Sequence, residues 1–429
     1  MHFRRFHIPL LLLLTIAAAC SSSNTVTPKV KPLVGLSVGF PGSGIGSQQC
    51  PPPLDQASNC YTPQELRTIY GVQPLTIQGY TGEGQTVLVI VPITSPRLQD
   101  DINAFDQEFG LPPITPQVVS IVGNVPFDPS NNNMVRSALE AELDVEMVHA
   151  IAPGAAIKVL TSPHATSIVD PIDVLQVEMY AVDHHLGQVL SQSIGFSEAP
   201  FLDHQDIAQQ FSDFYKQATT VEGVTILAAT GDDGAIVPSG GILPSTPTVD
   251  FPASDPWVTA VGGTTLERVG LDYVESAWSG SGGGVSALFS EPAYQQSLPS
   301  NVQTLLNGHR GLPDVAANAD PNTAMACYML GEWQQCGGTS ASTPFWAAMV
   351  AIANQVAGHP LGFINPVLYK LGVARQGDFH DITSGDNSVH MDGVNVTGFQ
   401  ATQGWDAVTG WGVPQAYQFI GDLISTSSS

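Results

Sequence analysis

Basic side chains are scarce in this chain of 429 residues, where 13 Lys and Arg stand against 38 Asp and Glu and the formal net charge is -25. Nucleic-acid-binding proteins neutralise phosphates with basic residues, so this composition argues against a nucleic-acid partner. Only 12% of the residues are charged and 43% are hydrophobic, as is typical of a folded globular protein. An acidic surface loses its self-repulsion when its carboxylates protonate, which favours operation at low pH.

Long hydrophobic runs are absent beyond the first twenty residues, so no later segment is predicted to span a membrane. At the N-terminus, Arg4 and Arg5 precede an apolar stretch over 8–19, which is typical of an export signal. Small residues before Cys20 and a polar stretch after it make residues 1–20 similar to a bacterial lipoprotein signal with Cys20 as the lipidated residue. Ordinary cleavage after the alanines is the alternative. We therefore predict an exported protein, lipid-anchored to the bacterial cell envelope or secreted.

Cysteines are also few, and setting Cys20 aside leaves Cys50, Cys60, Cys327 and Cys336. An even number of cysteines in an exported chain predicts disulfides. Proximity in the sequence favours the pairs Cys50–Cys60 and Cys327–Cys336, although four cysteines permit three connectivities. Neither spacing is a CxxC and no histidine is adjacent, which argues against a metal site.

The chain is predicted to form one body preceded by a tether. Residues 21–56 are rich in Ser, Pro and Gly, as in a tether and N-terminal arm. Strand and helix patterns alternate in the body, 57–429, with strands expected at 86–91, 156–160, 188–193 and 224–229, helices at 98–109, 137–150, 203–221 and 343–356, and a loop-rich tail. This alternation predicts an α/β fold with a doubly wound, mostly parallel sheet and helices on both faces.

Two carboxylates occupy the apolar side of the helix expected at 137–150. Glu140 and Asp144 are one turn apart and share their face with apolar residues, so both are expected to be buried. Two buried carboxyls this close cannot both ionise cheaply and should titrate as a coupled pair. An ion pair between Glu140 and Arg136, one turn earlier, is the structural alternative.

A second acidic pair on the same helix receives a different interpretation. Glu142 and Glu146 lie on roughly the opposite side of the helix from Glu140 and Asp144. Solvation is easy on an exposed face, so Glu142 and Glu146 are predicted to be solvated surface residues.

Ser340 and Asp232 stand at two further positions that suit catalysis. Ser340 opens the helix expected at 343–356, where free N–H groups and the helix dipole favour a developing oxyanion; an N-cap serine is the alternative. Asp232 follows the strand expected at 224–229. The carboxyl ends of parallel strands are where α/β active sites collect, although an aspartate here could also be a turn residue.

Taken together, these segments resemble the sedolisins, or serine-carboxyl peptidases, over roughly residues 61–429, with the kumamolisin branch nearest. The likeness rests on Glu140 to Asp144 with Ala152-Pro153-Gly154, Ala229-Thr230-Gly231-Asp232, Val249-Asp250-Phe251-Pro252-Ala253, Gly282-Gly283-Gly284-Val285-Ser286, Pro313-Asp314-Val315-Ala316, Gly338-Thr339-Ser340 and Gly404-Trp405-Asp406. It implies a subtilisin-like fold in which Ser340 attacks the scissile carbonyl and Glu140 takes its proton. Asp144 would orient Glu140, and a protonated Asp232 would donate to the oxyanion.

The resemblance also implies an acid-active endopeptidase that takes polypeptide substrates. A carboxylate serves as a general base only where it can be regenerated, and at such pH a histidine base would be protonated. Substrate-binding positions fall on Asp250, Ser193, Gly195 and Gly284, with Asp250 similar to an S1-pocket residue. A tripeptidyl exopeptidase of the same family, or a non-catalytic lipid-anchored binding protein on this scaffold, are the alternatives. A monomer is expected, with membrane contact only through the lipid anchor.

One Ca²⁺ ion is implied by likeness of the tail to the sedolisin calcium site. Its ligands would be the carboxylates of Asp381 and Asp406 and the carbonyls of Ile382, Thr402 and Gly404. Hard oxygen donors of this kind suit Ca²⁺. An ordinary acidic surface loop is the alternative.

The chain departs from the family pattern in two respects. Kumamolisin-like enzymes extend the hydrogen-bond chain of the catalytic pair with a glutamate and a tryptophan, and Val91 and Ile194 stand at the corresponding positions. Sedolisins also usually carry a long N-terminal prodomain, whereas a short arm separates Cys20 from the catalytic body here. We expect the apolar replacements to alter the pKa of the pair.

Overall fold

An eight-stranded sheet forms the centre of the part of the chain that the computed structural model describes, residues 49–57, 59–121, 125–161, 170–374, 377–391 and 393–427. The predicted signal segment, Cys20 and nearly all of the predicted tether lie outside the described residues. The main path of the sheet runs, in spatial order, through β12 (Val315–Asn318), β8 (Thr259–Val269), β6 (Thr225–Ala229), β4 (Val189–Gln192), β1 (Thr86–Val91), β3 (Ala156–Thr161) and β2 (Gln117–Ser120). Every pair along this path is parallel, and β9 (Asp272–Ala277) adds an antiparallel edge to β8.

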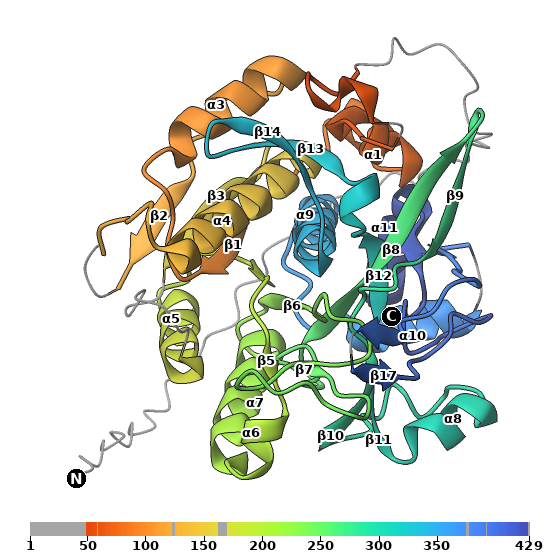
Figure 1. Cartoon of the computed structure of the whole chain (residues 1–429). Helices are drawn as coiled ribbons and strands as arrows, with labels where there is room; N and C mark the ends of the chain where they lie inside the picture. Colours follow the sequence, from red (N-terminus) through yellow and green to blue (C-terminus); the bar gives the residue numbers. More distant parts are fainter. Residues whose placement is uncertain are drawn as a thin grey trace, which may run out of the picture. The chain divides into compact units, whose positions relative to one another are not determined.

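The alternation of side chains along β1 assigns the helices to two faces of this sheet. Val87 and Val89 pack in one apolar cluster with α4 (Asn132–Ile151) and α9 (Thr339–Ala357). Leu88 and Ile90 pack in another with α5 (Pro171–Asp183) and α7 (Gln205–Thr220). Successive side chains of a strand point to opposite faces, so both faces are covered by helices (Figure 1). The predicted α/β fold, with a mostly parallel sheet and helices on both faces, is confirmed.

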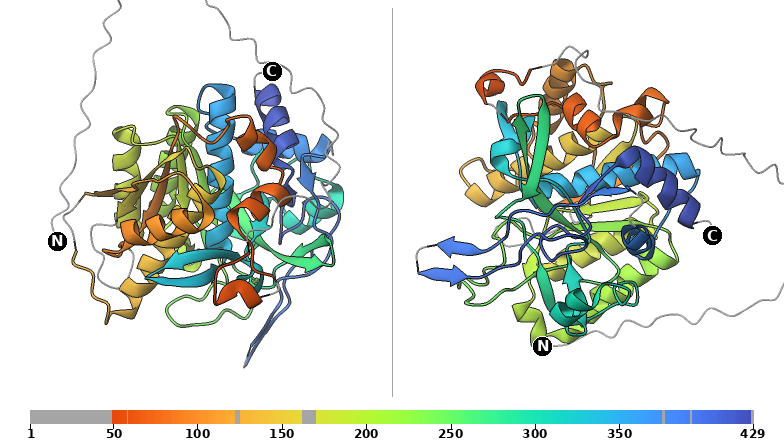
Figure 2. Two further views of the ribbon diagram at one scale, coloured as in Figure 1. Left: turned by 90° about the horizontal axis from the view of Figure 1, so that it is seen from above. Right: turned by 90° about the vertical axis from the view of Figure 1, so that its right-hand side faces the viewer.

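Shorter elements surround this core. The remaining described helices are α1 (Pro63–Ile69), α2 (Gln73–Ile77), α3 (Leu98–Phe109), α6 (Ala199–Leu202), α8 (Ser300–Leu306), α10 (Asn365–Ala374) and α11 (Ala416–Ser427). Small two-stranded sheets join β5 (Phe196–Ser197) to β7 (Asp250–Phe251), β10 (Gly284–Ser290) to β11 (His309–Leu312), β13 (Met325–Met329) to β14 (Glu332–Cys336), β15 (Phe379–His380) to β18 (Val413–Pro414) and β16 (Val389–Met391) to β17 (Val394–Val396). The β16–β17 hairpin extends away from the sheet (Figure 2). The tail predicted to be rich in loops therefore also contains α10 and α11.

Both favoured disulfide pairs are present. Cys50 bonds to Cys60, and Cys327 bonds to Cys336 across the β13–β14 hairpin. The second bond closes the segment that leads directly into α9.

Within the described ranges, no helix meets the length and apolarity that crossing a bilayer requires.

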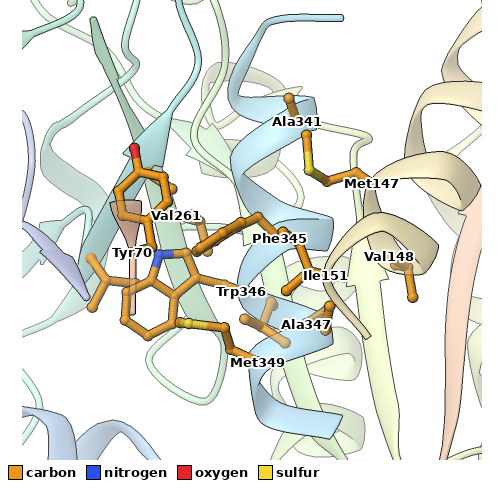
Figure 3. Packing of buried hydrophobic residues seen from close by; sticks show 14 of the residues in the cluster. Tyr70, Met147, Val148, Ile151, Val261, Ala341, Phe345, Trp346, Ala347 and Met349 are labelled. Carbon is orange, nitrogen blue, oxygen red and sulfur yellow. The ribbon is translucent and has the colours of Figure 1, made fainter. Parts of the chain in front are cut away.

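Helices α4 and α9 pack directly against each other. Met147 and Ile151 of α4 lie beside Ala341 and Phe345 of α9 (Figure 3). The side chains of α9 from Ala341 to Asn354 are all buried, and α9 also packs on β4 and β6. Interior packing of this density fixes the relative position of two helices to a fraction of an ångström. This packing brings residues near 140, on α4, close to residues near 340, on α9.

Candidate active site

Helix α4 carries the predicted carboxylate pair into the protein interior. Asn131 caps its N-terminus, accepting hydrogen bonds from the N–H groups of Asn133 and Met134, as an N-cap asparagine does. From Ala141 onward, every side chain of the helix is buried. Asp144 is fully buried and Glu140 is half-buried, with a carboxylate oxygen enclosed by protein.

Ser340 lies in the first turn of α9, as predicted. Its N–H group has no acceptor within the helix, because the first four N–H groups of any helix lack one. Gly338 precedes the helix with φ of 89°, a left-handed conformation that favours glycine. A Cβ at Gly338 would also lie 2.5 Å from Asp232 Oδ2. Glycine is therefore required here both for the turn and for the approach of Asp232.

Burial raises the pKa of both members of the pair. Desolvation raises the pKa of Glu140 to about 7, with a further rise from the charge of Asp232, while hydrogen bonding by Ser340 and Ser193 opposes the rise. Desolvation and the charge of Glu140 raise the pKa of Asp144 well above its ordinary value. The charge of Glu140 thus bears directly on the ionisation of Asp144, as expected for two interacting carboxyls.

Ser193 is the hydrogen-bond partner of Asp144. Its Oγ donates to Asp144 Oδ1 at 2.8 Å and lies 3.4 Å from the carbonyl oxygen of Ser340. It immediately follows β4, at the carboxyl end of the parallel sheet. The sequence placed Ser193 among the substrate-binding residues, and its contact with Asp144 was not foreseen.

Asp232 faces the N-terminus of α9. One carboxylate oxygen, Oδ1, accepts hydrogen bonds from the N–H and the Oγ1 of Thr339, at 2.7 and 2.8 Å. Desolvation of the carboxyl raises its pKa, and the two hydrogen bonds from Thr339 oppose the rise. Asp232 thus binds the residue that precedes Ser340 in the chain. The role of Thr339 was missed, although it stands inside the Gly338-Thr339-Ser340 segment.

A pocket of about 710 Å³ opens in front of Ser340. Ser340, Asp232, Ser193, Gly195 and Asp250 all line it. Its outer wall comes from Asp170 to Ile172, Phe196, Phe201, His204 and the loop from Val237 to Gly240, none of which the sequence singled out. The pocket does not include Gly284, which is buried at the start of β10 beside Phe399.

Asp250 occupies the floor of the pocket between two glycines. A Cβ at Gly195 would lie 2.9 Å from the Asp250 carboxyl, and one at Gly231 would lie 2.1 Å from Oδ2. The two glycines therefore leave the space that the carboxyl fills. Burial and the nearby Asp232, Asp233 and Glu198 raise the pKa of Asp250 well above its usual value.

The prediction for the second acidic pair of α4 is wrong. Glu142 and Glu146 are each only 1% exposed, because the β13–β14 hairpin covers their side of the helix (Figure 1). Glu142 accepts hydrogen bonds from Ser95 Oγ at 2.5 Å and from the N–H of Leu330 at 2.8 Å. Glu146 accepts one from the N–H of Tyr328 at 2.9 Å. Burial raises the pKa of Glu142 to about 7 and that of Glu146 well above the usual range.

Among the described residues, no basic side chain forms an ion pair with Glu140 or Asp144. Arg136 is exposed, and among the described residues no ion pair joins it to Glu140, which removes that alternative. Val91 is fully buried in the core, and Ile194 is half-buried against the cluster around α7. Neither can accept or donate a hydrogen bond through its side chain. The Oδ2 atom of Asp144 correspondingly has no hydrogen-bond partner in the described part of the chain.

Two of the predicted calcium ligands, Asp381 and Asp406, accept hydrogen bonds from one loop of the tail. Asp381 Oδ2 accepts the N–H of Gly404 at 2.8 Å, and Asp406 Oδ2 accepts the N–H of Thr402 at 2.9 Å. Both carboxylates therefore bind the loop whose carbonyls would complete the site. Nowhere in the described ranges do three or more His, Cys, Asp or Glu side chains gather to hold a metal, so an ion here would depend on loop carbonyls. The set of two carboxylates and carbonyl oxygens fits Ca²⁺.

Comparisons with known proteins agree with this geometry. A family model described as the subtilase family matches residues 123–365. The chain is 32% identical over 390 residues to kumamolisin of Bacillus sp. (strain MN-32), covering 87% of this chain and 65% of kumamolisin. It is 32% identical over 374 residues to tripeptidyl-peptidase sed4 of Aspergillus fumigatus, covering 73% of this chain and 58% of that protein. It therefore spans less than two thirds of the length of these curated relatives.

A solved structure matches most of the described fold. The structure is of Pseudomonas sedolisin, a serine-carboxyl proteinase, complexed with two molecules of pseudo-iodotyrostatin. It matches with a TM-score of 0.71 and 26% sequence identity, over 86% of this chain and 99% of that chain. The match to the subtilase family model, over 123–365, covers both α4 and α9.

Proposed function

Because the chain belongs to the sedolisin family of serine-carboxyl peptidases, which have the subtilase fold, we propose that it hydrolyses peptide bonds of polypeptides at acidic pH. The observation that carries this proposal is the placement of Ser340, Asp232 and Glu140 near one another. Ser340 and Asp232 line one pocket, the Ser340 hydroxyl lowers the pKa of the neighbouring Glu140, and Asp232 accepts hydrogen bonds from Thr339 at the start of α9.

In the proposed reaction, the Ser340 hydroxyl attacks the carbonyl carbon of the scissile bond and its proton passes to Glu140. The resulting oxyanion receives a hydrogen bond from protonated Asp232, whose raised pKa keeps its proton in place. The C–N bond then breaks as Glu140 returns the proton to the leaving amine, which leaves an ester on Ser340. Water cleaves the ester by the same route, with Glu140 as the base.

Asp144 supports Glu140 in this scheme. A buried carboxyl one turn away shares a proton with Glu140, so the pair can take up the proton of Ser340 without creating two adjacent charges. The pair must lose one proton to become a base. Activity should therefore rise as the first proton leaves and fall as Asp232 ionises or the fold weakens.

An endopeptidase with a preference for basic or polar side chains beside the scissile bond suits the pocket best. Asp250 supplies a carboxyl at the pocket floor, with Asp232 and Asp233 nearby. Relatives of the chain include kumamolisin and proteins named tripeptidyl-peptidases, so the length of the products decides between endopeptidase and tripeptidyl exopeptidase. The peptidase domain is proposed to span 57–429 and to act as a monomer.

Calcium and export complete the proposal. Asp381, Asp406 and the carbonyls of Ile382, Thr402 and Gly404 would hold one Ca²⁺, which would tie the two tail loops together and stabilise them. Two disulfides fit an oxidising compartment. The chain is accordingly proposed to be exported, anchored through Cys20 or released after cleavage.

The test is digestion of an unfolded protein by the purified chain between about pH 2 and 8, a range that spans carboxyl and histidine titration. Ser340→Ala and Glu140→Gln serve as the inactive variants, with folding of each checked by circular dichroism. An acid optimum that both variants lose supports the proposal, and mass spectrometry of the products separates endo- from exopeptidase. No cleavage by a folded, calcium-loaded sample would refute it, and an optimum above neutral pH would exclude Glu140 as the base.

A further inference from the structure

The hydroxyl of Ser193 connects the two halves of the active site. It lies 2.8 Å from Asp144 Oδ1 on α4 and 3.4 Å from the carbonyl oxygen of Ser340 on α9. Ser193 itself belongs to neither helix, because it follows β4 at the carboxyl end of the sheet. One small side chain therefore contacts the carboxyl pair and the backbone of the nucleophile.

Asp144 depends on this contact more than on any other. Its side chain is fully buried, its Oδ2 has no hydrogen-bond partner among the described residues, and its Oδ1 is paired with Ser193. A buried carboxyl without hydrogen bonds has no fixed orientation and carries a large desolvation cost. The Ser193 hydroxyl is thus the polar group that fixes which way Asp144 faces.

We propose that Ser193 is a positioning residue for the reaction, whose hydroxyl holds Asp144 in register with Glu140 and Ser340 whether or not Asp144 carries the shared proton. This inference rests on the proposed peptidase function. A serine hydroxyl both donates one hydrogen and accepts on its lone pairs. When Asp144 is ionised, Ser193 donates to Oδ1. When Oδ1 is protonated, it donates to Ser193 Oγ, and the Ser193 hydrogen turns to the Ser340 carbonyl.

The charges that act on this contact are all carboxylates. Glu140 lies one turn before Asp144 on α4, and Asp232 acts on Glu140 from the α9 side. No Lys, Arg or His forms an ion pair with any of these three in the described ranges. A hydroxyl that donates to Asp144 therefore stabilises the only negative charge that the pair can keep. Its removal should delay loss of the first proton to higher pH.

The test compares Ser193→Ala with Ser193→Thr, which keeps the hydroxyl, and with Ser191→Ala. Ser191 lies two residues earlier on β4, is fully buried, and its hydroxyl has no partner among the described residues, so it is a matched control. Ser193→Ala is expected to lower kcat roughly tenfold and to move the acid limb of kcat upward by about one pH unit, the worth of one hydrogen bond to a charged group. KM should change by less than about twofold, because the backbone that faces substrate is unchanged.

The threonine variant should recover most of kcat and the wild-type acid limb, and Ser191→Ala should match the wild type in both. A Ser193→Ala protein with an unshifted acid limb would overturn the proposal, as would a threonine variant that behaves like alanine. A carbon-13 NMR titration of the carboxyl groups in a Ser340→Ala background, with and without Ser193→Ala, reads the Asp144 contact without catalysis. A raised Asp144 titration alongside an inactive wild type would refute the peptidase function and retain the contact, whereas an unshifted titration would refute the contact alone.

Discussion

Helix α4 carries two pairs of carboxylates that have different partners. Asp144, Glu142 and Glu146 are fully buried, and Glu140 is half-buried. Glu140 and Asp144 face side-chain hydroxyls, those of Ser340 and Ser193, whose hydrogens can move. Glu142 and Glu146 accept hydrogen bonds from backbone N–H groups of the β13–β14 hairpin, and Glu142 also accepts one from the Ser95 hydroxyl. None of these donors lines the pocket in front of Ser340. Both pairs have raised pKa values, since desolvation dominates in each. Burial and a raised pKa therefore do not distinguish the proposed catalytic pair from the other pair, whereas contact with Ser193 and Ser340, which line the pocket, does.

The largest separation between the pairs should appear in activity. Glu140→Gln removes the proposed base and is expected to lower kcat by roughly a thousandfold or more at every acidic pH. Glu142→Gln makes the same chemical change two residues away and should leave kcat within about twofold. Steady-state cleavage of a peptide substrate at the pH optimum measures both. Equal losses in the two variants would mean that the two pairs act as one unit.

A truncation should reveal the structural role of the second pair. Glu142→Ala leaves the Leu330 N–H and the Ser95 hydroxyl without their acceptor in a buried place, at a cost of about 2–4 kcal/mol in the free energy of unfolding. Denaturant unfolding at pH 4 gives the value, with Glu142→Gln as control, because an amide can accept from Leu330 and donate to Ser95. A free energy of unfolding of Glu142→Ala equal to that of the wild type would contradict a stabilising role for the contact between Glu142 and the hairpin.

Stability should decline as the pH rises from the acid range to neutrality. The pKa of Glu142 rises from 4.5 to about 7 on folding, and burial raises the pKa of Glu275 to about 7 and that of Glu178 to about 8. Between pH 4.5 and 7, the folded state holds protons that the unfolded state has released, so the free energy of unfolding falls with increasing pH. Glu142→Gln should remove on the order of 1–3 kcal/mol of this fall. Thermal unfolding of the wild type and of Glu142→Gln at pH 4.5 and at pH 7 measures this fall in each protein. An equal fall in both proteins would argue that Glu142 is already ionised at pH 4.5.

Calcium removal should have the smallest effect and should spare both pairs. A chelator is expected to lower the melting temperature by a few degrees, equivalent to about 1–3 kcal/mol for a moderately tight site. Asp406→Asn should reproduce this loss and abolish the response to the chelator, without moving the pH profile of activity. Differential scanning calorimetry at pH 5 with and without calcium provides the measurement. A melting temperature that changes with neither the chelator nor added calcium would rule out the proposed calcium site.

The sequence predicted the core elements well because their patterns are local. The strand at 86–91 and the helix at 98–109 match β1 and α3 residue for residue. Short elements in the tail escaped notice, since α10 begins at Asn365-Pro366 and α11 follows a two-residue strand. Their helical patterns are brief and flanked by Pro and Gly, which favours a loop interpretation.

The environment of Glu142 and Glu146 could not be read from the helix that carries them. An amphipathic pattern distinguishes the apolar face of a helix from its polar face, but it does not show what packs against the polar face. Here the acceptors are matched by N–H groups of Tyr328 and Leu330, nearly two hundred residues later. Backbone donors cannot be recognised in a sequence, because nearly every residue has an N–H group. The hydroxyls near Glu140 belong to Ser193 and Ser340, which can be recognised as serines.

The burial of α4 from Ala141 to Ile151 affects how long such an enzyme survives among copies of itself. No peptide bond from Ala141 to Ile151 can enter another molecule's pocket until the fold opens globally, because every side chain there is buried. Self-digestion would instead begin at projecting segments, such as the β8–β9 turn, where Leu271 is 95% exposed, or the stretch around Ile242, which is 73% exposed. The first cleavages would occur at these segments and would leave Glu140, Ser340 and their packing intact. Autolysis should therefore shorten the chain well before it abolishes activity.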